Sequence, residues 1–126
     1  MATGSKDWYA PQTGLIANEI RNGNCTDDEY RLYTAVSGYN FYLTSVWINI
    51  NNGSGAMEYG KVFLKTGAGS TKHAIIQMYV MGGESNNLAI SLNKAFLLPT
   101  GYEIFLKSNA LNVLVSGGLT GYEQKA

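Results

Sequence analysis

The stretch 39–50, YNFYLTSVWINI, is the longest run of β-forming residues in the chain and decides the fold class. Aromatic and branched apolar residues alternate with polar ones, which is the period of a strand that buries one face. The phase changes inside the run, from odd-numbered to even-numbered apolar residues: Phe41 and Leu43, then Val46, Ile48 and Ile50. We therefore predict a β-bulge near Thr44-Ser45 that bends this strand.

Short apolar runs of the same kind, separated by turns rich in Gly, Asn and Ser, lie on both sides of this stretch. Together the predicted strands cover 30–35, 39–50, 58–66, 73–80, 88–98, 102–107 and 112–121. Residues 15–21 fit either an irregular strand or a short helical turn. Short strands at this spacing are typical of a sandwich or barrel. We expect an all-β fold: an antiparallel jelly-roll β-sandwich of about eight strands over residues 15–126, with an extended N-terminal arm over residues 1–14.

One face of each strand after residue 58 is apolar, and we assign it to the core. The predicted inner residues are Val62, Leu64, Ala74, Ile76, Met78, Val80, Leu88, Ile90, Leu92, Tyr102, Ile104, Leu106, Val113 and Val115. The opposite face should be polar if it meets water. It nevertheless carries large apolar groups, namely Trp47, Phe63, Ile75, Tyr79, Phe105 and Leu114. These six are the candidate oligomer interface, unless twist, loops or the arm cover them.

The charge content of the chain also favours association. Charged residues make up 14% of its 126 residues, and nine Lys and Arg balance nine Asp and Glu. A surface so short of charge does little to keep copies apart, and a balanced charge gives no field that attracts nucleic acid. The first 14 residues contain no apolar run, so we expect no signal peptide, no membrane partner and synthesis in the cytoplasm.

The residue types that carry catalysis are scarce. His73 is the one histidine and Cys25 the one cysteine, so neither a His-pair metal site nor a disulfide within the chain is possible. Asp27, Asp28 and Glu29 form the densest acidic cluster of the chain. Their spacing is not that of an EF-hand, so we interpret them as a solvated loop, with a weak Ca²⁺ site as the alternative. We expect no enzyme, no cofactor and no metal centre.

Three segments of the chain resemble small jelly-roll virion proteins of tailed phages. They are FYLTSVWINI at 41–50, AFLLPTGYEIFLKS at 95–108 and LNVLVSGGLTGYE at 111–123. The resemblance consists of strands and turns: a long strand ending in Asn, an L-P-x-G turn and a last strand ending in Gly-Tyr-Glu. It implies a virion protein that decorates the capsid or builds a head fibre or tail part. It also implies a homotrimer whose N-terminal arm grips the major capsid protein or a neighbour.

The arm is polar except around Trp8, Tyr9 and Pro11, which are the candidate anchors. Trp and Tyr bury large areas with few torsions to freeze, so they suit the docking of an extended segment. The leading hypothesis is a structural virion protein that oligomerises and binds the capsid lattice. The second hypothesis is a carbohydrate- or receptor-binding module of a phage tail or fibre, because jelly rolls host lectins and exposed aromatic rings stack on sugars.

Overall fold

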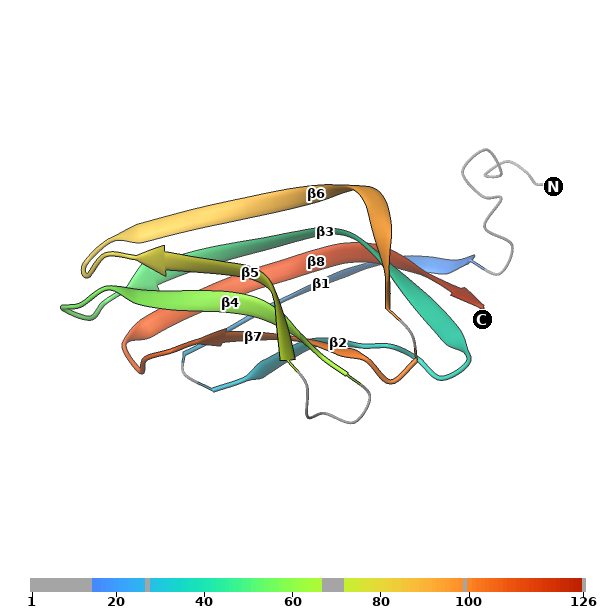
Figure 1. The fold of residues 1–126 in the computed structure, drawn as a ribbon, viewed down its shortest axis with the longest axis horizontal. Helices are drawn as coiled ribbons and strands as arrows, with labels where there is room; N and C mark the ends of the chain where they lie inside the picture. Colours follow the sequence, from blue (N-terminus) through green and yellow to red (C-terminus); the bar gives the residue numbers. More distant parts are fainter. Residues whose placement is uncertain (1–14, 27, 67–71, 99, 126) are drawn as a thin grey trace.

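The computed structural model describes residues 15–26, 28–66, 72–98 and 100–125. The strands are β1 (Leu15–Cys25), β2 (Tyr30–Thr34), β3 (Tyr39–Asn52), β4 (Glu58–Lys65), β5 (Lys72–Val80), β6 (Ser85–Leu98), β7 (Glu103–Ser108) and β8 (Val113–Lys125) (Figure 1). No helix occurs among the described residues. The all-β prediction is confirmed, and residues 15–21 belong to a strand whose pairing is irregular between Leu15 and Asn18.

The strands form two antiparallel sheets that pack face to face. The β3 sheet has the order β1-β8-β3-β6, and the β4 sheet has the order β2-β7-β4-β5. Strands β5 and β6 are therefore edge strands on one side of the sandwich, and β1 and β2 are edge strands on the other. This arrangement decides which side chains are covered, because an edge strand has a neighbour on one side alone.

The predicted bend in β3 is present. Its pairing with both β6 and β8 shifts register between Leu43 and Ser45, as a bulge at Thr44 requires. The apolar residues on both sides of the bulge consequently face inward: Phe41, Leu43, Val46, Ile48 and Ile50 are all buried. Gly121 lies close to this bend, and a Cβ there would fall 2.4 Å from the Phe41 ring, so the packing requires glycine.

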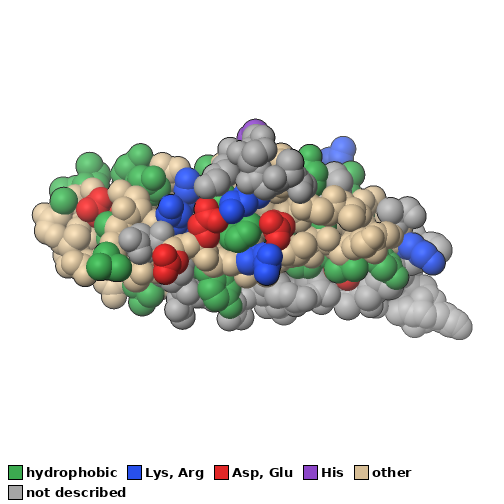
Figure 2. All heavy atoms as spheres, turned by 90° about the horizontal axis from the view of Figure 1, so that it is seen from below, with side chains coloured by type: hydrophobic (Ala, Val, Ile, Leu, Met, Phe, Trp, Pro, Cys, Tyr) green, Lys and Arg blue, Asp and Glu red, His purple; other side chains and the backbone are tan. Residues whose placement is uncertain are grey.

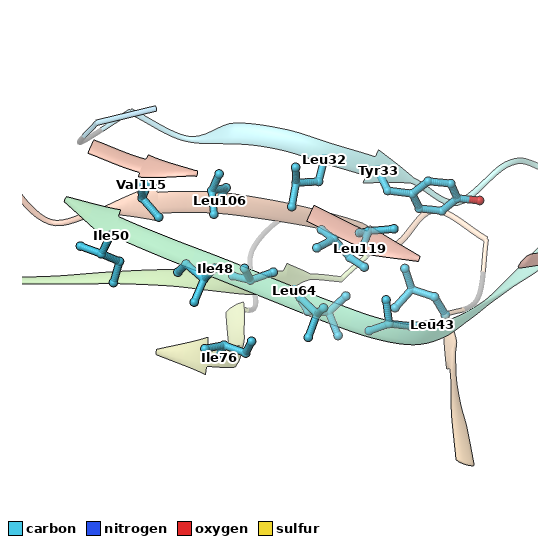
Figure 3. Close-up of a cluster of buried hydrophobic side chains, with 14 of the residues drawn as sticks. Leu32, Tyr33, Leu43, Ile48, Ile50, Leu64, Ile76, Leu106, Val115 and Leu119 are labelled. Carbon is cyan, nitrogen blue, oxygen red and sulfur yellow. The ribbon is translucent and has the colours of Figure 1, made fainter. Parts of the chain in front are cut away.

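The core lies between the sheets, and side chains from both of them point toward one another (Figure 3). Most of the predicted inner residues are buried, namely Val62, Leu64, Ile76, Val80, Ile104, Leu106, Val113 and Val115. The prediction is wrong for Leu88, which is 42% exposed, and for Ala74, which is exposed. Met78, Ile90, Leu92 and Tyr102 are half-buried and pack against the core. The cause is position: β5 and β6 are edge strands, so parts of their inner faces have no strand of the opposite sheet above them.

One polar pair lies inside the sandwich. The Tyr33 hydroxyl of β2 donates a hydrogen bond to Glu123 Oε2 of β8, and both residues are buried. The Tyr33 ring also packs on Phe41, with 4.1 Å between centroids. The pair therefore joins the two sheets at the end of the molecule where β3 begins.

Tyr33→Phe is expected to lower the free energy of unfolding by about 1–3 kcal/mol, because a buried carboxylate loses a donor. Urea unfolding followed by circular dichroism measures the change. Tyr30→Phe is the matched control, since Tyr30 lies on the same strand and is 41% exposed. Equal stability of the two variants would show that the Tyr33 hydroxyl contributes nothing.

Candidate interaction surface

The six candidate interface residues do not lie on one surface. Trp47 and Leu114 are on the outer face of the β3 sheet, where Trp47 pairs with Gly118 and Leu114 pairs with Asn51. Phe63, Phe105 and Tyr79 alternate with inward-facing residues of the β4 sheet and so occupy its outer face. The outer faces of a sandwich point in opposite directions. The structure therefore separates the set into two groups, with Ile75 apart from both at the edge of the core.

The outer face of the β4 sheet is covered by charged groups of the same chain. Phe63 and Phe105 pair across the strands with their ring centroids 5.7 Å apart. Lys61 Nζ lies 4.9 Å from the Phe63 centroid, and Lys65 Nζ lies 4.3 Å from the Phe105 centroid. The expectation that these two rings are open to partners is therefore wrong: they are 1% and 8% exposed. The lysines cover them by cation–π contact and through their aliphatic stems.

Two cations of this face are paired with acidic groups. Lys65 Nζ donates to Glu29 Oε1, and Arg31 Nη1 lies 3.0 Å from Glu103 Oε2. Figure 2 shows basic and acidic side chains interspersed around a hydrophobic centre on one side of the molecule. The spacing Lys61-x-Phe63-x-Lys65 was the sequence signal for this arrangement, because residues two apart share a strand face. A face that carries charged groups is costly to desolvate against a partner.

The outer face of the β3 sheet is different. Cross-strand partners share a face, so the pairing of β3 with its two neighbours defines this surface. We call it the uncharged face: Tyr42, Ser45, Trp47, Asn49 and Asn51 of β3, Ser85, Asn87, Ala89, Ser91 and Leu97 of β6, and Leu114, Ser116, Gly118, Thr120 and Tyr122 of β8. None of these residues carries a charge. Three strands therefore present amide, hydroxyl, aromatic and aliphatic groups without a charge.

Trp47 lies near the middle of the uncharged face and is 37% exposed. Its directly opposite cross-strand neighbours are Gly118 and Ala89, which are the two smallest residue types. Toward one end the rings of Tyr42 and Tyr122 stack with centroids 5.1 Å apart. Toward the other end Leu114 is 45% exposed. The surface thus has aromatic and apolar groups along its length.

A second feature is a cleft between the two edge strands β5 and β6. It has a volume of about 250 Å³ and is lined by Leu43, Leu64, His73, Ala74, Ile75, Leu92 and Phe96. We call it the edge cleft. His73 is the one polar side chain in that lining and is exposed, as expected of a residue on an edge strand. Sequence reasoning missed the cleft, because it depends on which strands lie at the edges.

The turn at Asn52 also has a role that the sequence did not reveal. The Asn52 side chain is buried and donates from Nδ2 to the carbonyls of Val80, at 2.8 Å, and Ala56, at 2.9 Å. Its Oδ1 accepts from the Ser54 amide at 2.9 Å. One side chain thus ties the β3–β4 loop to the end of β5. The motif Asn-Asn-Gly predicted a turn but not a buried network.

Of the remaining candidates, Trp8, Tyr9, Pro11 and Asp27 are outside the described residues, and Cys25 ends β1. Glu29 of the acidic cluster is bonded to Lys65, and no group of three or more potential metal ligands occurs among the described residues. The described part of the chain also contains no helix long and apolar enough to cross a membrane.

The fold and its surfaces define an antiparallel β-sandwich with one uncharged and one charged outer face. No protein-family model and no curated protein matches the chain.

Proposed function

We propose that the sandwich is a jelly roll. The strand pairs β1–β8, β2–β7, β3–β6 and β4–β5 support this, because each strand pairs with its counterpart counted from the other end of the chain. Such nesting is what results when one long antiparallel hairpin is rolled up, so that its strands divide between two sheets. Jelly rolls are used in viral capsid proteins and lectins, which agrees with both functional hypotheses.

We propose that the protein is a structural phage virion protein, a capsid decoration or similar auxiliary protein. In this proposal it forms a homotrimer through the uncharged face and binds the major capsid protein. The virion and the three-fold symmetry rest on the resemblance of residues 41–50, 95–108 and 111–123 to small phage jelly-roll proteins. The uncharged face is the observation that carries the interaction.

Desolvation explains why the uncharged face suits association. Burying an unpaired charge is costly, whereas amides and hydroxyls exchange water for partner groups at small net cost. Interface centres are depleted of charge and enriched in Trp and Tyr, as around Trp47, Tyr42 and Tyr122. A closed ring in which the three uncharged faces turn toward the common axis leaves no adhesive surface free and so prevents open fibres.

Binding to the shell is tested with capsids assembled without this protein. The purified chain should bind them at saturable, symmetric positions visible by electron microscopy. Shells that stay bare at concentrations where the oligomer is intact would contradict the capsid role. That result would leave oligomerisation untouched, because the solution mass measures it separately.

The second candidate is a carbohydrate- or receptor-binding module, which the setting of Trp47 favours. Because Gly118 and Ala89 flank it, the indole is open to stacking against a sugar ring. Asn49 and Ser91 belong to the same face and offer amide and hydroxyl groups. Titration with host-surface polysaccharide, followed by tryptophan fluorescence, tests this candidate. Saturable quenching by a monomeric chain would replace the assembly proposal with the binding-module proposal.

A further inference from the structure

The edge cleft is an apolar site without an assigned occupant. Leu92 and Phe96 of β6 face Ala74 and Ile75 of β5 across it, and Phe96 is 45% exposed. Apolar cavities of about 150 Å³ bind a ring the size of benzene, so a cleft of about 250 Å³ can hold a larger aromatic group. An open apolar cleft of this kind calls for a covering group.

The chain carries a matching group outside the described residues. Residues 1–14 are polar apart from a short block with two adjacent aromatic rings, Trp8 and Tyr9. An indole suits the cleft chemically, because its ring is apolar while its N–H needs an acceptor once buried. His73, at the wall of the cleft, has a ring nitrogen that can accept in the neutral form.

The reach of the chain agrees with this match. Leu15 pairs with Gln124, which pairs with Asn40, so the start of β1 is level with the start of β3. Crossing the sheet from β1 to β6 takes three strand spacings, about 14 Å, and Leu43 lies about 10 Å further along β3. The direct distance is thus about 17 Å, whereas the seven residue-to-residue steps from Trp8 to Leu15 extend to about 23–25 Å. Figure 1 shows the start of β1 and the bent part of β6 at the same end of the sandwich.

We propose that the N-terminal segment, residues 1–14, docks in the edge cleft of its own chain, with the Trp8 indole inserted between β5 and β6. Docking within one chain is favoured over docking on a neighbour because the short connection holds Trp8 at a high effective concentration near the cleft. This inference does not depend on the virion role. It gives the segment a binding site on the subunit itself, whereas the resemblance implies that it grips the shell or a neighbour.

The test uses the full chain with Trp47→Phe, in which Trp8 is the one remaining tryptophan. Trp8 emission should be blue-shifted relative to free tryptophan and protected from iodide, and neither property should change on dilution. Adding Phe96→Asp should shift the emission to the red and restore quenching. Leu88→Asp is the matched control, because Leu88 lies on the same strand and is 42% exposed but does not line the cleft.

Ala74→Glu, at an exposed position on the β5 wall, repeats the test if Phe96→Asp does not fold. Circular dichroism confirms the fold of each variant. Complete quenching of Trp8 emission by iodide in the folded Trp47→Phe chain would overturn the proposal. Equal effects of Phe96→Asp and Leu88→Asp would overturn it as well. Protection that is lost on dilution would assign Trp8 to a neighbouring copy instead.

Discussion

Trp47→Asp should convert the proposed trimer into single folded chains. The substitution places a carboxylate at the centre of the uncharged face, where no cation of the defined surface can pair with it. Assembly would then bury an unpaired charge at every contact, which costs several kcal/mol each. Trp47 is 37% exposed in the single chain, so the fold itself should tolerate the change. Light scattering coupled to size exclusion measures the mass, and circular dichroism checks the fold.

Tyr79→Asp is the matched control for this prediction. Tyr79 is 57% exposed and lies on the outer face of the β4 sheet, beside Tyr59. Tyr79→Asp introduces the same charge at an aromatic position of the other sheet, and the proposed trimer should persist. Leu114→Asp, which charges the uncharged face at a second point, should act like Trp47→Asp. Dissociation by Tyr79→Asp, with Trp47→Asp still assembled, would move the interface to the β4 sheet.

Asn52→Ala is expected to lower the free energy of unfolding by about 2–4 kcal/mol. The change removes the donors to Val80 O and Ala56 O together with the acceptor for the Ser54 amide. Each buried polar group left without a partner costs about 1–3 kcal/mol, and the bond to Val80 O is the buried one. Urea unfolding gives the change directly.

Two variants separate the hydrogen bonds of Asn52 from its shape. Asn52→Asp keeps the volume but loses both N–H donors, so it should destabilise the protein at neutral pH at least as much as Asn52→Ala. Asn51→Ala, at the exposed neighbouring position, should change stability by less than about 0.5 kcal/mol. An Asn52→Ala protein as stable as Asn51→Ala would show that the network contributes nothing.

Local alternation predicted the strands and the bend in β3, because period and phase can be read directly from neighbouring residues. The phase change between Leu43 and Val46 gave the bulge its correct place. Burial on β6 could not be read in this way: Leu88 follows the pattern of a core residue but lies on an edge strand and is 42% exposed. Strand order depends on contacts between distant segments, which no local pattern contains.

The candidate surface, too, was predicted from the sequence only in part. Alternation correctly placed Trp47 and Phe105 on outer faces, but it could not tell that these faces point in opposite directions. Phe105 is covered by Lys65, so one ring is protected while the other is open to solvent. The uncharged face appears only when β3 is set between β6 and β8, because its residues come from three separate stretches of the chain.

The solution mass of the unmodified chain tests the proposed assembly most directly. Light scattering over a hundredfold range of protein concentration distinguishes a stable oligomer from transient association. We expect the mass of three chains throughout the upper part of that range, with dissociation, if any, only on strong dilution. The mass of one chain at every concentration would contradict association through the uncharged face.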